Sequence, residues 1–457
     1  MLSRRSFLRS SATAVGGASL APVAARASGP TDYKALVFVY LDGGIDCHEV
    51  LIGYDMASYD LWRGARQAVI DRLDTGPNAG IRARDNLLAL DPLNADDFGG
   101  RQFAMPPEFS GLHTLFQSEK LAIIPNVGPL IEPTDRAMVD AGTALYPMRL
   151  RSHNDQRSTW QALSVEGART GWGGEFLDAF QQTSPYTGIS LAGQSVFLSG
   201  KETRQINLPS SGNITEVFGG SGRAYGSREL ATKLLNYYKT AGLSADNALM
   251  RDIMNSQAQA IDNTDLARTA LAGKTLGDAV RISGNDLSEQ LATVANVIEA
   301  RDDFGVNRQV FFVRMVGYDS HSNLTQRLPD LLTQLSDALL SFQNALDSAG
   351  LTDMVTTMTG SEFGRTLVSN AQGTDHGWGG HHFAMGGAVA GGRIAGAVPE
   401  FDVGNINHEK RGSLIPQISL EQYGSEFGRW FGLTNADLDT VFPNRDRFET
   451  AALGVFR

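Results

Sequence analysis

The stretch Ala35-Leu36-Val37-Phe38-Val39-Tyr40-Leu41, which runs directly into Asp42-Gly43-Gly44, is the most informative segment of this sequence. A continuous apolar run with β-branched and aromatic side chains, ended by a turn, is typical of a strand buried on both faces. Strands of this kind occur in parallel sheets, where helices cover both sides. The segment therefore predicts a central strand of a parallel α/β sheet over residues 35–41.

Further strands and helices are predicted to alternate along the rest of the chain. The expected strands are 121–125, 310–316, 354–359 and one that begins at 383. The expected helices are 111–120, 286–303 and 331–349, the last ending at Gly350. This alternation favours an α/β fold with a doubly wound, mostly parallel sheet and helices on both faces. We expect residues 28–457 to form one domain, with a helical insertion or cap around residues 195–285.

The N-terminus carries an export pattern. Ser3-Arg4-Arg5-Ser6-Phe7-Leu8 resembles the twin-arginine consensus, a small-residue apolar stretch follows over 12–24, and Ala25-Arg26-Ala27 provides a cleavage site. The apolar stretch is shorter than the roughly 20 residues that a membrane span requires. We therefore predict that residues 1–27 are a signal peptide. The twin-arginine translocase would export the folded protein to the periplasm or beyond, and no transmembrane segment is expected in the mature chain.

Charge and cysteine content narrow the possible functions. The formal net charge of the 457 residues is −11, and removal of residues 1–27, with four arginines and no acid, brings it to −15. Nucleic acid is not an expected partner, because binding to phosphate backbones requires clustered Lys and Arg. Cys47 is the single cysteine, so no disulfide can form within the chain. Its thiol is either a metal ligand or nucleophile, or a small buried side chain.

Acids and imidazoles follow successive predicted strands. This set consists of Asp42, Asp46, Asp319, His321, Glu362, Asp375, His376, His381 and His382. In open α/β sheets, ligands bind beyond the carboxyl ends of the strands. Carboxylate oxygens and imidazole nitrogens are ligands for Zn²⁺, Mn²⁺, Mg²⁺ or Ca²⁺. Each residue also has an ordinary alternative role as a helix cap or a hydrogen-bonded core group, but the set as a whole predicts a divalent metal site.

Several segments together resemble the exported bacterial family known as domain of unknown function 1501, in the alkaline phosphatase and sulfatase-like superfamily. The resemblance covers the mature chain from about Tyr33 onward. It rests on the segments that contain Asp42-Gly43-Gly44, Arg151-Ser152-His153, Gly171-Trp172-Gly173-Gly174, Asp319-Ser320-His321, Glu362-Phe363-Gly364-Arg365-Thr366 and Asp375-His376-Gly377-Trp378 with Gly379-Gly380-His381-His382.

The resemblance implies a mechanism with two metal ions and a hydroxyl or modified-cysteine nucleophile. It implies that Asp42 or Asp46 bridges the metals and that Ser152 is the nucleophile. Asp319 and His321 would hold one metal, with His376 or His382 as a further ligand. Glu362 stands where the superfamily often has the Asp of an Asp-His-Gly triplet.

Phe363 departs from this pattern, because it follows Glu362 where many relatives have a histidine ligand. The second metal site is then lost, reduced or rebuilt from His153, His381 or Asp375.

Two hypotheses follow. The first is a metal-dependent hydrolase of a small anionic phosphate or sulfate ester, with Ser152, His153 and Arg365 in catalysis. Arg365 would pair with substrate oxygens, or would instead form a structural salt bridge. The second hypothesis is a non-catalytic protein that keeps the fold to bind a partner at the cell surface. Metal content separates the two.

Overall fold

A computed structural model describes residues 32–214, 223–241, 247–370, 372–449 and 451–457. The predicted signal peptide, residues 1–27, lies outside the described residues. Among the described helices, none is both long enough and apolar enough to cross a membrane.

The main sheet has eight strands in the order β11-β5-β10-β9-β1-β8-β6-β7. Their bounds are β1 Lys34–Asp42, β5 Leu121–Gly128, β6 Gly188–Ser190, β7 Ile206–Asn207, β8 Arg308–Val316, β9 Val355–Gly360, β10 Gly380–Met385 and β11 Ile418–Ser419. All neighbouring pairs are parallel except those of β10, which runs antiparallel to both β5 and β9. The predicted α/β class with a mostly parallel sheet is therefore confirmed.

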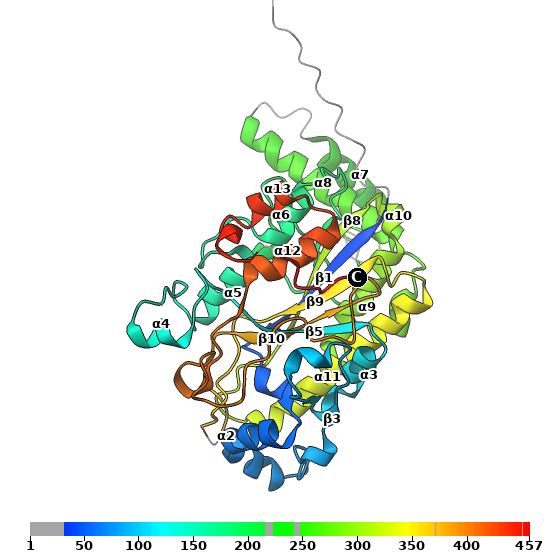
Figure 1. Cartoon of the computed structure of the whole chain (residues 1–457). Coiled ribbons are helices and arrows are strands. Elements are labelled where there is room, and N and C mark those ends of the chain that lie inside the picture. The colour runs from blue at the N-terminus through cyan, green and yellow to red at the C-terminus, as the bar shows by residue number, and fades with distance from the viewer. Residues whose placement is uncertain (1–31, 215–222, 242–246, 371, 450) are drawn as a thin grey trace, which may run out of the picture.

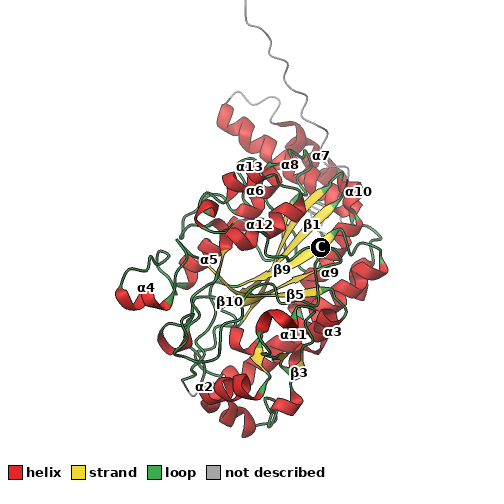
Figure 2. Cartoon of the chain, viewed as in Figure 1, coloured by secondary structure: helices red, strands yellow, loops and turns green. Residues whose placement is uncertain are grey.

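β1 lies in the middle of the sheet, as its sequence indicated. Successive residues point to opposite faces, so Val37 and Val39 join one hydrophobic cluster while Phe38 and Tyr40 join the other. Helices α2 (Met56–Asp74), α3 (Ser110–Gln117), α9 (Asp286–Glu299) and α11 (Leu324–Ser348) contribute to the first cluster. Helices α5 (His153–Ala162), α6 (Trp172–Asp178), α12 (Leu420–Phe431) and α13 (Asn435–Val441) contribute to the second. Figures 1 and 2 show the sheet between these two layers.

The remaining elements adjoin these two layers. A small sheet contains β2 (Ile52–Gly53), β3 (Leu88–Ala89) and β4 (Phe103–Met105). Helix α4 (Arg136–Ala141) projects from one side, and α10 (Arg301–Phe304) follows α9 (Figure 1). Within the predicted insertion, α7 (Arg228–Thr240) packs against α8 (Ala248–Ala270), and this pair projects from the end of the molecule opposite α2. Whether the insertion is a cap remains a prediction.

Two boundaries differ from the sequence prediction for identifiable reasons. α11 begins at Leu324, before the predicted start at 331, because Pro329 falls in its second turn and removes only one early hydrogen-bond donor. Its predicted end is confirmed, since Gly350 adopts a left-handed φ of 68°. β10 begins at Gly380 rather than 383, so His381 and His382 lie inside the strand and not before it.

Candidate metal centre

The reversed direction of β10 brings four loops together. Parallel strands β1, β8 and β9 end at one edge of the sheet, and antiparallel β10 begins there, with Gly380 paired to Val127 near the end of β5. The residues that precede β10 therefore meet those that follow the other strands. Gly43 makes this approach possible, because its φ is 123° and a Cβ there would lie 2.2 Å from the Asp319 amide nitrogen.

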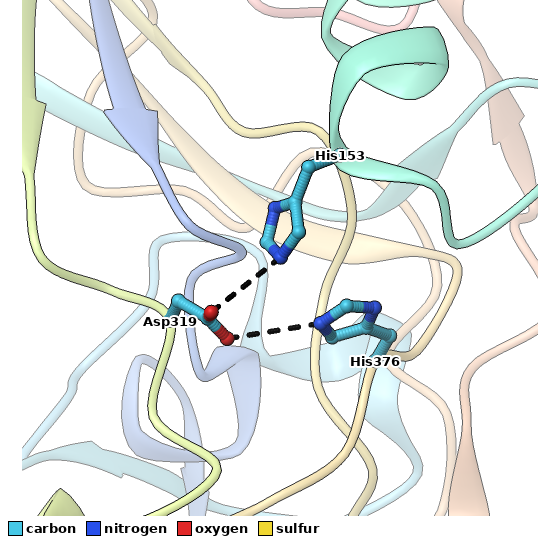
Figure 3. Close-up of side chains that lie close together, drawn as sticks. All are labelled: His153, Asp319 and His376. Atoms are coloured by element: carbon cyan, nitrogen blue, oxygen red, sulfur yellow. Dashed lines mark ion pairs between the residues drawn. The ribbon is translucent and has the colours of Figure 1, made fainter.

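His153, Asp319 and His376 converge at this edge (Figure 3). One ligand atom from each residue lies within 4.8 Å of the others. His153 Nε2 is 3.6 Å from Asp319 Oδ2, and His376 Nε2 is 3.7 Å from Asp319 Oδ1. His153 is the first residue of α5, Asp319 follows β8, and His376 precedes β10. Two imidazoles and a carboxylate are a donor set that suits a divalent transition metal and leaves a coordination position open.

His153 and His376 are oriented by hydrogen bonds at Nδ1, the ring nitrogen on the side away from Asp319. His153 Nδ1 lies 2.8 Å from Glu362 Oε1, and His376 Nδ1 lies 2.9 Å from the Arg151 carbonyl. Since both partners are acceptors, each Nδ1 carries a proton, and Nε2 is the ring nitrogen on the side of Asp319. Burial lowers the pKa of His376 to about 4, so its imidazole is neutral at physiological pH. Second partners of this kind are characteristic of histidine metal ligands.

Glu362 supports His153 and does not reach the group itself. Its carboxylate is fully buried, and Oε1 also accepts a 2.8 Å hydrogen bond from the Gly43 amide. Glu362 was predicted as a metal ligand, but in the structure its carboxylate contacts His153 and is not part of the His153–Asp319–His376 group.

His321 and Asp375 adjoin the group. His321 Nε2 lies 2.8 Å from His376 Nε2 and 3.3 Å from Asp319 Oδ1. The short distance between the two Nε2 atoms requires a proton on His321 Nε2 or a cation between the two rings. Asp375 contacts His321 Nδ1 at 3.5 Å and pairs with Arg411 at 2.7 Å. His321 therefore lies next to the His153–Asp319–His376 group, and Asp375 contacts the other nitrogen of its ring.

Arg365 lies beneath Asp319 as a buried structural cation. Its Nη2 donates to Asp319 Oδ1 at 2.7 Å and to the carbonyls of Gly43 and Tyr318, while Nε donates to the Gly44 carbonyl and Nη1 to that of Thr374. Partial burial alone would raise the pKa of Asp319, but the Arg365 guanidinium outweighs this effect and lowers it. The structure therefore favours the salt-bridge role of Arg365 over the predicted contact with substrate.

Phe363 packs against both histidines, whose rings also contact each other with centroids 4.5 Å apart. Its ring stacks on His376 with centroids 4.3 Å apart and lies 5.0 Å from the ring of His153. Among the described residues, the His153–Asp319–His376 group is the only one that meets these distances. Of the three residues considered for rebuilding the second site, His153 joins this group, whereas His381 does not.

Four predicted ligands lie elsewhere. Asp46 is buried, and its carboxylate pairs with Arg66 at 2.7 Å. His381 Nδ1 accepts from the Asn126 amide, and His382 packs against Trp160 on the opposite face of β10. The predictions for Asp46, His381 and His382 are corrected, because each of these side chains contacts other residues in the interior. Asp42 pairs with Arg157 at 2.6 Å and Arg314 at 3.5 Å.

Ser152 and Cys47 have distinct surroundings. Ser152 immediately precedes α5, and its hydroxyl donates a 2.7 Å hydrogen bond to Asp155. That bond lowers the pKa of Asp155. Cys47 is fully buried, and burial raises its pKa to about 12. The thiol is therefore a small core group, as one of the two alternatives held.

Sequence reasoning missed the Arg151 carbonyl and the two arginines at Asp42. A backbone acceptor has no sequence signal. Arg157 did have one, because it lies four residues after His153 on the same helix and so shares its face.

The family profile described as "Protein of unknown function (DUF1501)" matches residues 33–411, and this chain belongs to that family. A comparison with curated proteins finds no match. Among solved structures, the PsFucS1 sulfatase from Pseudoalteromonas sp. aligns with 10% identity and a TM-score of 0.34, covering 93% of this chain and 73% of the other. A structure reported with glycosaminoglycan metabolism by Bacteroides thetaiotaomicron aligns with 10% identity and a TM-score of 0.26, covering 79% of this chain and 69% of the other. Neither score is high enough to transfer an activity to this chain.

Proposed function

We propose that this protein is a metal-dependent hydrolase of phosphate or sulfate esters that acts in the periplasm after folded export. The observation that carries the proposal is the orientation of His153 and His376, whose Nδ1 atoms are both bound to acceptors while their Nε2 atoms face Asp319. A hydrogen-bonded core pair has no need of this arrangement. The export step rests on the arginine pair and cleavage pattern of residues 1–27.

His153, Asp319 and His376 would hold the metal, with His321 as an additional ligand. Two nitrogens and one oxygen favour Zn²⁺ or Mn²⁺ over Mg²⁺ or Ca²⁺. A bound divalent ion would polarise the ester oxygens and stabilise an oxyanion nucleophile. Asp319 has an exposed fraction of 49%, so the centre is open to a substrate from solvent. Arg365 keeps Asp319 in place and ionised.

Ser152 is the proposed nucleophile, and Asp155 orients its hydroxyl through a hydrogen bond. The Ser152 hydroxyl already donates to Asp155, which leaves its oxygen lone pairs free. Ser152→Ala should lower the turnover number by about 10³-fold or more without changing metal content. Single-turnover kinetics and metal analysis would measure this. Unchanged turnover would mean that water attacks directly.

Glu362→Gln provides a test of the centre that does not remove a ligand. The amide keeps the shape of the side chain but weakens the acceptor that orients His153 Nδ1. We expect metal affinity to fall about 10- to 100-fold, as for other outer-sphere partners of histidine ligands. Competition with a chromophoric chelator would measure the affinity. If the variant binds metal as tightly as the unaltered protein, Glu362 plays no part in the centre.

Elemental analysis and an ester screen test the proposal as a whole. The chain without residues 1–27 should bind about one equivalent of metal and hydrolyse aryl phosphate or sulfate esters only when loaded with metal.

The second candidate, a non-catalytic binding protein, is favoured by one observation. The apolar ring of Phe363, which cannot bind a metal, packs against both imidazoles. Stoichiometric metal without ester hydrolysis would support that candidate, and absence of metal after loading would overturn the proposed centre.

A further inference from the structure

Two arginines from different elements meet at one carboxylate beside the metal centre. Arg157 lies on α5 and Arg314 on β8, and both pair with Asp42 at the end of β1. Their side chains are 34% and 38% exposed, whereas Asp42 is 11% exposed. Among the described residues, Asp42 is the only acceptor within hydrogen-bond distance of either guanidinium. The two guanidiniums share this one directly bonded carboxylate, and the buried Glu362 carboxylate also attracts Arg157.

Short covalent and hydrogen-bonded links connect this arginine pair to the centre. Arg157 is four residues from His153 on the same helical face. Asp42 directly precedes Gly43, whose amide donates to Glu362, the residue that orients His153. The arginine pair and the candidate metal group therefore lie at the same edge of the sheet, and their spacing is fixed by β1 and α5.

Arg314 also borders a cavity and is held firmly there. The cavity has a volume of about 580 Å³, and its lining includes Arg314, Gln290, Ser210 and the two acids Asp286 and Glu289. Gln290 bonds to both backbone groups of Arg314, with its Oε1 accepting from the Arg314 amide at 3.0 Å and its Nε2 donating to the carbonyl at 2.9 Å. The backbone of Arg314 is thus fixed while its guanidinium remains half exposed, an arrangement that suits ligand binding more than packing.

We propose that Arg157 and Arg314 form an oxyanion subsite that binds a second sulfate, phosphate or similarly charged group of the substrate. This inference rests on the proposed ester hydrolase function. A guanidinium binds tetrahedral oxyanions through paired N–H donors. Asp42 occupies these donors in the free protein and competes with the ligand. The preferred substrates are therefore esters with two anionic groups, one at the metal and the other at the arginine pair.

Substitutions at the two ends of this arrangement should act in opposite directions. The probe is inorganic sulfate, titrated calorimetrically at low ionic strength into the mature chain after metal removal with a chelator. Arg314→Gln should weaken sulfate binding about tenfold, because a charged hydrogen-bond donor is lost while Arg157 still neutralises Asp42. Asp42→Asn should strengthen binding about threefold or more, because the competing carboxylate is gone.

Arg281→Gln is the matched control, because Arg281 pairs with Glu289 near the same cavity and does not contact Asp42. An equal loss in Arg281→Gln and Arg314→Gln would show a general charge effect and overturn the subsite. Unchanged sulfate binding in both Arg314→Gln and Asp42→Asn would overturn it as well. This assay needs no metal and no turnover, so its failure is distinguishable from failure of the proposed hydrolase function.

A second measurement separates a substrate group from a free anion. Methanesulfonate and alkane disulfonates of increasing length are titrated into the metal-loaded protein. A disulfonate that reaches both the metal and the arginine pair should bind at least about tenfold more tightly than methanesulfonate. If all disulfonates bind no more tightly than methanesulfonate, the pair is a separate anion site and its assignment to substrate is overturned.

Discussion

Asp319→Asn is expected to remove the bound metal and to lower ester hydrolysis by about 10³-fold or more. The carboxylate is the only anionic member of the His153–Asp319–His376 group, so its loss leaves two neutral imidazoles to hold a divalent cation. Asparagine keeps an oxygen that can accept from Arg365 Nη2, which lies 2.7 Å from Oδ1. The buried guanidinium therefore retains a partner, and the fold should survive.

Metal content by elemental analysis and activity on an aryl ester would be measured on the same preparation. Asp60→Asn is the matched control, since Asp60 is an exposed residue of α2 and its loss removes the same charge. Circular dichroism would confirm that both variants are folded. If Asp319→Asn retains about one equivalent of metal, the centre proposed here is not where the metal binds.

Arg66→Met is expected to destabilise the fold by about 3–5 kcal/mol. Arg66 is fully buried and bonds to both Asp46 and Glu49, while Arg82 bridges Glu49 to Glu108. Burial raises the pKa of Asp46. Burial would also raise the pKa of Glu49, but its two guanidinium partners outweigh this and lower it. Removal of Arg66 leaves buried carboxylates without their counter-charge, which costs far more than the lost contacts.

Urea denaturation, followed by fluorescence, would measure the free energy of unfolding. Lys233→Met is the control, because Lys233 forms an exposed pair with Glu229 four residues earlier along α7. Pairs of this kind contribute about 0.5 kcal/mol or less. Equal destabilisation in the two variants would show that the buried network has no special contribution. If Arg66→Met is insoluble while Lys233→Met is not, the expected direction is still met.

The layered fold could be predicted because its signals are local. The apolar run at 35–41 needs cover on both faces wherever it lies, and the helical periodicity of 331–349 ends at a glycine that adopts the expected left-handed conformation. The direction of β10 could not be predicted, since it depends on pairing with β5 and β9, which are distant in sequence. That direction decides that Asp375 and His376 reach the edge where β8 ends.

The residue types of the candidate centre were also visible in the sequence, but their division of roles was not. Asp319, His321 and His376 lie together as expected. Asp42 and Asp46 follow the same strand yet pair with Arg157, Arg314 and Arg66. An acid at a strand end is equally suited to a metal or to a guanidinium, and the choice depends on which cation the fold places beside it.

The sequence by itself determined the family, the mostly parallel α/β fold and the pool of acids and histidines from which a centre could form. The tertiary structure decided that His153 and not His382 joins His376, that Glu362 orients a histidine, and that Arg365 is a buried cation. The physical reason is the distance along the chain over which each kind of interaction acts. Burial and periodicity act between neighbours in the chain, whereas hydrogen bonds and ion pairs at the sheet edge join residues more than two hundred positions apart, such as His153 and Glu362.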